Sequence, residues 1–214
     1  MTAPAPWPRL RRDLVAILRG VRPDEVEAVA GALAEAGFEA IEVPLNSPDP
    51  FRSIEGLARR FGAEVLVGAG TVLEPDDVDR LRDAGGRLMV SPNVEAAVLR
   101  RAVPLGLVTL PGVFTATEAL AALRFGASAL KAFPASVLGP AGLAAIRTVL
   151  PAGTVMAAVG GVSEADFAAY AAAGFRSFGL GSSLYAPGDP PAAVAAKACA
   201  VVAAYDAVFE GGSP

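Results

Sequence analysis

The chain has 214 residues, of which 53% are hydrophobic, and its formal net charge is −4. This length fits one domain, and the charge excludes an electrostatic footprint for nucleic acid or an anionic membrane. The chain has no histidine and a single cysteine, Cys199, which excludes a histidine general base, an internal disulfide and any cysteine or histidine metal cluster. Proton transfer in an enzyme of this composition falls to a carboxylate, a lysine, a tyrosine or water.

The first residues are rich in proline and alanine and hold no apolar signal core. We therefore expect a cytoplasmic protein with a partly ordered leader over residues 1–12, followed by a single domain over 13–214. We also expect no apolar run long enough to span a bilayer.

A glycine recurs after each of seven helix-like or turn-like segments and precedes an apolar run each time. Glycine just past a helix end is the expected cap, because it accepts the left-handed conformation cheaply. These glycines are Gly37, Gly62, Gly85, Gly106, Gly126, Gly153 and Gly174. With one run before the first glycine, eight strands are predicted: Leu14–Leu18, Ala40–Val43, Val65–Val67, Leu88–Ser91, Leu107–Leu110, Ala129–Phe133, Val155–Val159 and Ser177–Leu180.

Helix-like stretches alternate with these runs, and two of them open with a capping box. The long ones are Pro23–Ala36, Pro75–Ala84, Thr115–Phe125, Gly142–Leu150, Ser163–Ala173 and Pro191–Val208. Strands alternating with helices indicate parallel pairing, and eight such units indicate an α/β fold of the (β/α)8 TIM barrel type. The alternative is a doubly wound sheet, which needs a phosphate-binding glycine loop after its first strand. The turn here reads Arg19-Gly20-Val21-Arg22-Pro23, which lacks that fingerprint.

Active sites of barrels lie at the carboxyl ends of the strands, so reactive side chains at those ends are the candidate site residues. Lys131 lies in an apolar strand, where burial favours the neutral, nucleophilic amine. Strand alternation turns both Lys131 and Glu42 into the barrel. The plainer interpretations are a lysine whose head reaches water and a buried ion pair kept for stability. Desolvation makes such a pair a weak source of stability, so a catalytic pair is favoured.

Three further strand ends carry candidate binding groups. Arg19 is placed to pair with an acid or to grip a substrate carboxylate. Gly160-Gly161 and the Gly179–Ser183 segment expose backbone N–H groups after the seventh and eighth strands, where barrels commonly bind phosphate. The alternative is that these glycines only form tight turns. Thr71 is a weaker candidate, because a threonine after Gly-Ala-Gly also serves as a helix cap.

Seven motifs in order, from about Leu14 to Pro187, resemble the family of 2-keto-3-deoxy-6-phosphogluconate and -galactonate aldolases. They are Ile41-Glu42-Val-Pro-Leu-Asn-Ser47, Gly68-Ala-Gly-Thr-Val72, Ser91-Pro-Asn93, Pro111-Gly112, Leu130-Lys131-Ala-Phe-Pro134, Val159-Gly-Gly161 and Gly179-Leu-Gly-Ser182. The resemblance implies a homotrimeric class I aldolase with no metal and no cofactor. Its substrate would be a phosphorylated keto sugar acid, cleaved to pyruvate and D-glyceraldehyde 3-phosphate.

The same resemblance implies a role for each matching residue. Lys131 would form the Schiff base and Glu42 would be the general acid and base. The substrate-binding residues implied are Arg19 and Thr71 for the carboxylate, Pro92 and Phe133 for the pocket wall, and Gly160, Gly161, Gly181 and Ser182 for the phosphate. Asn46 and Pro44 stand where the gluconate type usually has arginine and threonine, so the galactonate type is expected. The gluconate epimer as main substrate, a phosphosugar isomerase and a silent phosphate-binding barrel are the alternatives.

Overall fold

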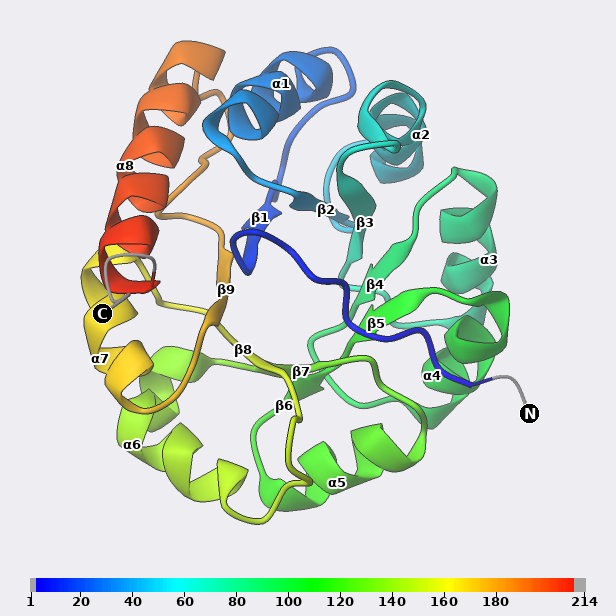
Figure 1. The fold of residues 1–214 in the computed structure, drawn as a ribbon. Helices are drawn as coiled ribbons and strands as arrows, with labels where there is room; N and C mark the ends of the chain where they lie inside the picture. The colour runs from blue at the N-terminus through cyan, green and yellow to red at the C-terminus, as the bar shows by residue number, and fades with distance from the viewer. Residues whose placement is uncertain (1–2, 210–214) are drawn as a thin grey trace.

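Strands and helices alternate through residues 3–209, the part of the chain that the computed structural model describes (Figure 1). The strands are β1 (Leu14–Ile17), β2 (Ala40–Pro44), β3 (Leu66–Gly70), β4 (Leu88–Val90), β5 (Val108–Leu110), β6 (Gly112–Val113), β7 (Leu130–Ala132), β8 (Met156–Val159) and β9 (Ser177–Leu180). The helices are α1 (Val26–Ala36), α2 (Pro50–Phe61), α3 (Pro75–Asp83), α4 (Ala96–Ala102), α5 (Ala116–Arg124), α6 (Ala135–Arg147), α7 (Phe167–Ala172) and α8 (Pro191–Phe209). Two 3₁₀ turns, η1 (Val103–Leu105) and η2 (Glu164–Asp166), complete the described chain.

All strand pairs are parallel, in the order β5-β4-β3-β2-β1-β9-β8-β7-β6. Only Pro111 separates β5 from β6, so these two segments occupy one position in the ring. The ring closes next to it, where the Ala129 and Lys131 amides donate to the carbonyls of Thr109 and Pro111 at 3.1 and 2.9 Å. With the helices outside, as Figure 1 shows, the expected (β/α)8 barrel is confirmed.

Side chains along each strand alternate between the barrel interior and the layer beneath the helices. On β2, Ala40 belongs to the interior cluster, whereas Ile41 and Val43 belong to the outer one. Glu42 therefore faces inward with Ala40. The same alternation on β7 puts Leu130 outside and turns Lys131 into the barrel.

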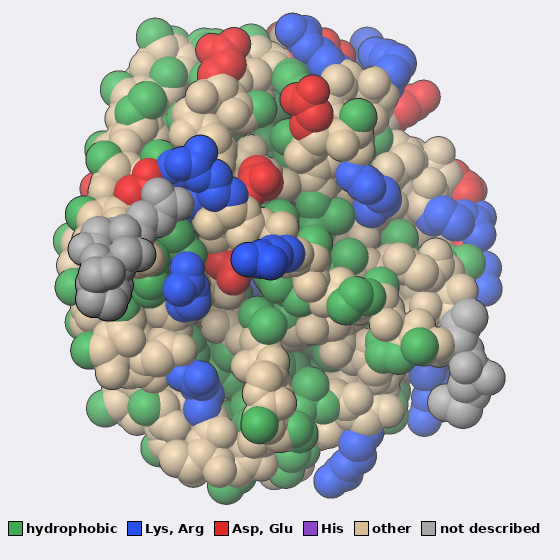
Figure 2. Space-filling view, viewed as in Figure 1, with side chains coloured by type: hydrophobic (Ala, Val, Ile, Leu, Met, Phe, Trp, Pro, Cys, Tyr) green, Lys and Arg blue, Asp and Glu red, His purple; other side chains and the backbone are tan. Residues whose placement is uncertain are grey.

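The segment before β1 crosses the end of the barrel at which the strands begin (Figure 1). Trp7 and Leu10 pack against the interior cluster, and Trp7 Nε1 donates to Asp13 Oδ1 at 2.9 Å. This segment therefore covers the floor of the interior cluster, and substrate access is left to the opposite mouth. On the face around it, Figure 2 shows basic and acidic side chains intermingled rather than gathered by sign.

Several expected helix boundaries are confirmed within a few residues, and both capping boxes are present. Thr115 and Glu118 exchange hydrogen bonds at the start of α5. Ser163 and Asp166 do the same, but there the helix opens as η2 before continuing as α7. Six of the seven cap glycines have positive φ. Gly62 does not, since its φ is −61° and it continues the right-handed turn of α2.

The helix expected over Gly142–Leu150 lies within α6, whose bounds are Ala135–Arg147. Gly139, with φ 65° and ψ 174°, is not helical, so α6 consists of two helical segments joined at a kink, and the expected helix corresponds to the second segment. Two helices, α2 and α4, were not singled out from the sequence. The start of α2 could have been predicted from the sequence, because Pro50 lies in its first turn.

The expectation that no apolar run is long enough to span a bilayer is wrong for helix α8. By length and composition alone this 19-residue helix is long and apolar enough to cross a bilayer. In the structure it lies along α1 and α7. Asp206 on α8 accepts two hydrogen bonds from Arg12, each 2.6 Å, which ties the helix to the beginning of the first strand. Its apolar side chains thus serve as an outer layer of the barrel.

Candidate active site

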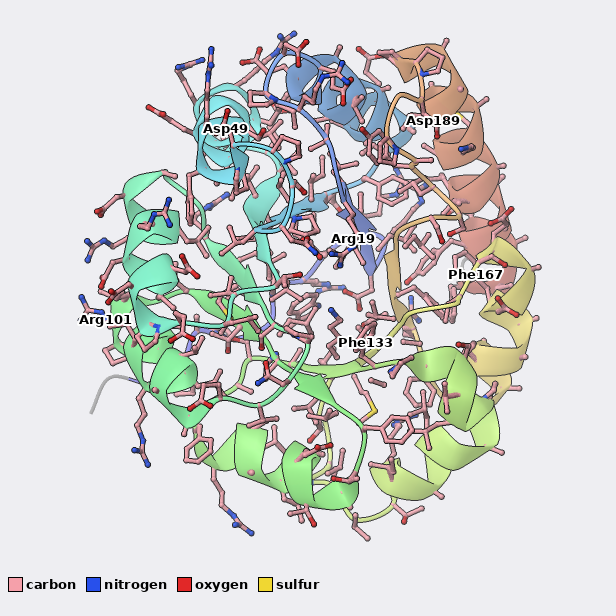
Figure 3. The ribbon with its side chains drawn as sticks, turned by 180° about the vertical axis from the view of Figure 1, so that it is seen from behind. Arg19, Asp49, Arg101, Phe133, Phe167 and Asp189 are labelled. Carbon is pink, nitrogen blue, oxygen red and sulfur yellow. The ribbon has the colours of Figure 1, made fainter. Side chains whose placement is uncertain are left out.

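A cavity of about 360 Å³ opens at the carboxyl ends of the strands. Figure 3 shows Arg19 and Phe133 at the centre of this mouth, with Asp49 and Asp189 on the loops around it. The cavity is lined by Ile17, Arg19, Glu42, Lys131, Phe133, Val159, Gly160, Gly161, Val162, Gly179, Gly181 and Ser182. A hollow of similar size, about 380 Å³, lies between α1, α2 and α8, but neither buried ionisable group described below lines it. The mouth of the barrel is therefore the candidate site.

Lys131 comes from the middle of β7 and is only 5% exposed. Its Nζ lies 4.6 Å from the centroid of the Phe133 ring, on the same face of the chain two residues later. Burial lowers the pKa of Lys131 below its ordinary value of 10.5, the Glu42 carboxylate opposes that effect, and Arg19 adds to it. A lowered pKa raises the fraction of neutral amine, which is the form that attacks a carbonyl.

Glu42 comes from the middle of β2 and is 2% exposed. Burial raises the pKa of Glu42 from 4.5 to about 7, while Lys131 and Arg19 each act to lower it. Its Oε2 has no hydrogen-bond partner among the described residues. A carboxyl group with a pKa near neutrality both accepts and donates a proton at low cost, which is what a group that serves as base and then acid requires.

Arg19 follows β1 at the rim of the cavity and is exposed. Its Nη1 donates to Asn46 Oδ1 at 2.6 Å. One residue further along each loop, the Gly20 amide donates to the buried Ser47 Oγ at 2.9 Å. The loop after β2 thus holds both the backbone and the guanidinium of the loop after β1, leaving the other guanidinium donors available to an anion.

The opposite wall is built of backbone. Gly160 and Gly161 have φ of 91° and 69°, a region that favours glycine. A side chain at Gly161 would overlap Ser136, and the Ser136 amide donates to the Gly160 carbonyl at 3.1 Å, so this wall is packed against the start of α6. With Gly181 and Ser182, the wall presents main-chain groups and one hydroxyl to the cavity, as an anion site does.

Eight of the ten residues predicted from the sequence line this cavity. Among the described residues, Thr71 and Pro92 do not. Thr71 directly follows β3 and has φ of 56°, which is rare for a β-branched residue. Pro92 lies two residues beyond β4, where its carbonyl packs against Gly112. Both follow the carboxyl ends of their strands, at the same end of the barrel as the cavity.

Three lining residues, Ile17, Val159 and Val162, were not predicted to bind substrate, whereas Gly179 belongs to the Gly179–Ser183 segment that was. Strand alternation could have predicted that Ile17 and Val159 line the cavity, since each is the last residue of its strand and faces the barrel interior. Val162 belongs to the loop after Gly161, whose path the sequence pattern does not define. No cluster of three or more acidic, cysteine or histidine side chains within residues 3–209 is suited to hold a metal ion.

A family model described as "KDPG and KHG aldolase" matches residues 9–188. A protein of Rhizobium meliloti called "Probable 2-dehydro-3-deoxy-6-phosphogalactonate aldolase" is 64% identical over 96% of this chain and 97% of its own length. The Escherichia coli 2-dehydro-3-deoxy-6-phosphogalactonate aldolase is 47% identical over 90% of this chain and 94% of its own. A solved "Native KDPGal structure" superposes with a TM-score of 0.93 at 45% identity, covering 96% of this chain and 99% of that one.

Proposed function

The chain belongs to the KDPG and KHG aldolase family, and from that premise we propose that it cleaves 2-dehydro-3-deoxy-6-phosphogalactonate through a Schiff base on Lys131. The products are pyruvate and D-glyceraldehyde 3-phosphate. The observation that carries the proposal is the inward, buried amine of Lys131 in one cavity with a buried carboxyl whose pKa lies near 7. An amine and an acid–base group in a water-poor pocket are what imine-forming cleavage needs.

The reaction follows from those two groups. Lys131 Nζ attacks the C2 ketone, and loss of water leaves a protonated imine. Glu42, directly or through a water, removes the C4 hydroxyl proton. The C3–C4 bond then breaks, its electron pair moves into the imine, and the aldehyde product leaves. Glu42 returns its proton to C3 of the enamine, and water hydrolyses the pyruvate imine to free Lys131.

The remaining residues bind the two charged ends of the substrate. We assign Arg19 to the carboxylate, because its guanidinium stands at the cavity rim and is held by Asn46. Thr71, which directly follows Gly70 at the end of β3, is assigned to the same carboxylate. Phe133 and Pro92, which follow β7 and β4, would bound the pyruvate moiety.

The phosphate is assigned to Gly160, Gly161, Gly181 and Ser182, whose backbone and hydroxyl face the cavity. The galactonate epimer is supported by the substrates that the names of the two relatives state. It is also supported by Asn46, which takes the place of the arginine typical of the gluconate type. We further propose a homotrimer, which sedimentation at micromolar concentration would test.

Borohydride trapping with pyruvate tests the imine. Lys131 should carry a stable pyruvate adduct, located by peptide mass mapping. The only other lysine, Lys197, is the internal control, because it is on α8 and pairs with Asp189 at 2.7 Å. Turnover without trapping at Lys131 would favour an isomerase or another route. Rates with the two C4-epimeric substrates, measured through pyruvate release, then test the epimer preference.

A further inference from the structure

Strand β3 carries two glycines on its inward face. Leu66 belongs to the interior cluster and Val67 and Ala69 to the outer one, so alternation turns Gly68 and Gly70 into the barrel. Neither glycine has positive φ, so backbone conformation does not explain them. The reason must lie in what a side chain at these positions would meet.

The two glycines face different neighbours. A methyl group on Gly68 would overlap the main-chain carbonyl of Leu88 on the adjacent strand β4. The three atoms nearest to a methyl group on Gly70 would be the carboxyl carbon and both carboxyl oxygens of Glu42, and all three would overlap it. The backbone at Gly68 cannot yield without separating two strands, whereas the end of the Glu42 side chain can turn away.

The carboxyl group of Glu42 lies against the main chain of Gly70 on the side of β3. Glu42 Oε2 has no hydrogen-bond partner within the described part of the chain, and Glu42 has only 2% of its surface exposed. At Oε2 the carboxyl group is thus held by packing, which includes the bare main chain at Gly70, rather than by a hydrogen bond. The volume that a side chain at position 70 would occupy is the volume in which the carboxyl group lies.

We propose that Gly70 is a positioning residue for Glu42, and that its missing side chain holds the carboxyl group at the depth from which it serves the reacting carbons. This rests on the proposed function for the identity of the reaction, but its packing basis does not. In the Gly70→Ala protein the methyl group would push the carboxyl group toward the open cavity. Better hydration there would also lower its proton affinity toward that of an ordinary glutamate.

The kinetic test compares Gly70→Ala with the parent and with Gly31→Ala. Gly31 is a matched control, because it lies within α1, has no positive φ, and a methyl group there meets only Phe61 at an ordinary 3.8 Å. Gly31→Ala should leave kcat unchanged. In Gly70→Ala, borohydride trapping of pyruvate on Lys131 should stay within about threefold of the parent. Its kcat for cleavage should fall by about tenfold to a hundredfold, since a displacement of about 1 Å has effects of that size.

The pH profile distinguishes positioning from general damage. In the parent, the acidic limb of kcat/KM, which reports the free enzyme, should reflect a group with a pKa near 7, and in Gly70→Ala that limb should move to lower pH. A kcat within twofold of the parent, or trapping lost in proportion to cleavage, would overturn the proposal. Absence of trapping in the parent itself would instead reject the Schiff-base function.

A stability measurement keeps the inference testable even if Gly70→Ala folds poorly. The four proteins are the parent, Gly70→Ala, Glu42→Ala and the double variant, and their thermal midpoints form a cycle. With Glu42 present, the added methyl group should lower the midpoint. With Glu42→Ala, it should enter the vacated space and leave the midpoint unchanged or higher. An equal effect in both backgrounds would show that Gly70 does not act through Glu42.

Discussion

The replacement Glu42→Gln should make the protein more stable at neutral and alkaline pH while removing most of its activity. Glutamine keeps the size of the side chain but cannot be ionised. Glu42 is buried, and burial raises its pKa from 4.5 to about 7. Because the folded protein holds this proton more tightly than the unfolded chain, the contribution of Glu42 favours folding below pH 4.5. That contribution is lost as the pH rises through 7.

The magnitude follows from the two pKa values. A pKa raised from 4.5 to about 7 corresponds to about 3 kcal/mol of folding free energy. We therefore expect Glu42→Gln to exceed the parent in stability by about 3 kcal/mol at pH 8 and by less than about 1 kcal/mol at pH 5. Cleavage should fall by about 10²–10⁴-fold, the usual effect of losing a general acid–base group. A more stable but inactive protein is the signature of a group retained for catalysis.

Urea denaturation at pH 5 and pH 8, at one fixed protein concentration, measures the difference. Glu118→Gln is a control of opposite sign, because Glu118 accepts hydrogen bonds from the amides of Phe114 and Thr115, which lower its pKa. The ionised Glu118 side chain should therefore stabilise the parent at pH 8, and Glu118→Gln should lower the stability of the protein at that pH. If the difference in unfolding free energy between the parent and Glu42→Gln is the same at pH 5 and pH 8, Glu42 does not carry a raised pKa.

Three more replacements test other parts of the site and fold. Lys131→Arg keeps the charge and removes the nucleophile, so turnover and pyruvate trapping should both vanish; near-normal turnover would reject the imine. Asn46→Ala frees the Arg19 guanidinium, so in the condensation assay KM for pyruvate should rise about three- to tenfold with KM for D-glyceraldehyde 3-phosphate unchanged. A rise in both KM values would show that Asn46 supports the loop structure in general rather than the carboxylate contact of Arg19. Trp7→Ala should cost about 2 kcal/mol in urea denaturation with kcat at 25 °C unaltered, because Trp7 packs at the barrel end away from the site; unchanged stability would contradict the sealing role.

The barrel was predictable because its signals are local and repeated. Period-two alternation alone turns Glu42 and Lys131 inward, and the structure shows both side chains buried in one cavity. The capping boxes at Thr115 and Ser163 were readable because Ser and Thr hydroxyls and the acid three residues later satisfy known helix-end donors. Such features need no knowledge of distant parts of the chain.

What escaped prediction depends on contacts between distant segments. The hold of Asn46 on Arg19 joins two loops that are 27 residues apart. The place of the Glu42 carboxyl group depends on the bare main chain of Gly70 on the next strand. The first helical segment of α6, before Gly139, also escaped prediction, because non-helical Gly139 separates it from the segment that the sequence did predict.

The residues that break the rules of stability gather at one end of the barrel. Glu42 and Lys131 are ionisable side chains in the interior, and Thr71 holds a backbone conformation that β-branched residues avoid. Each destabilises the fold by itself, and burial is also what shifts both pKa values toward the range in which they are useful. The opposite end follows the rules, with apolar strands covered by Trp7 and Leu10. Destabilising residues scattered over the whole fold would have no common explanation. Because these residues are concentrated around one cavity, we infer that they are retained for catalysis.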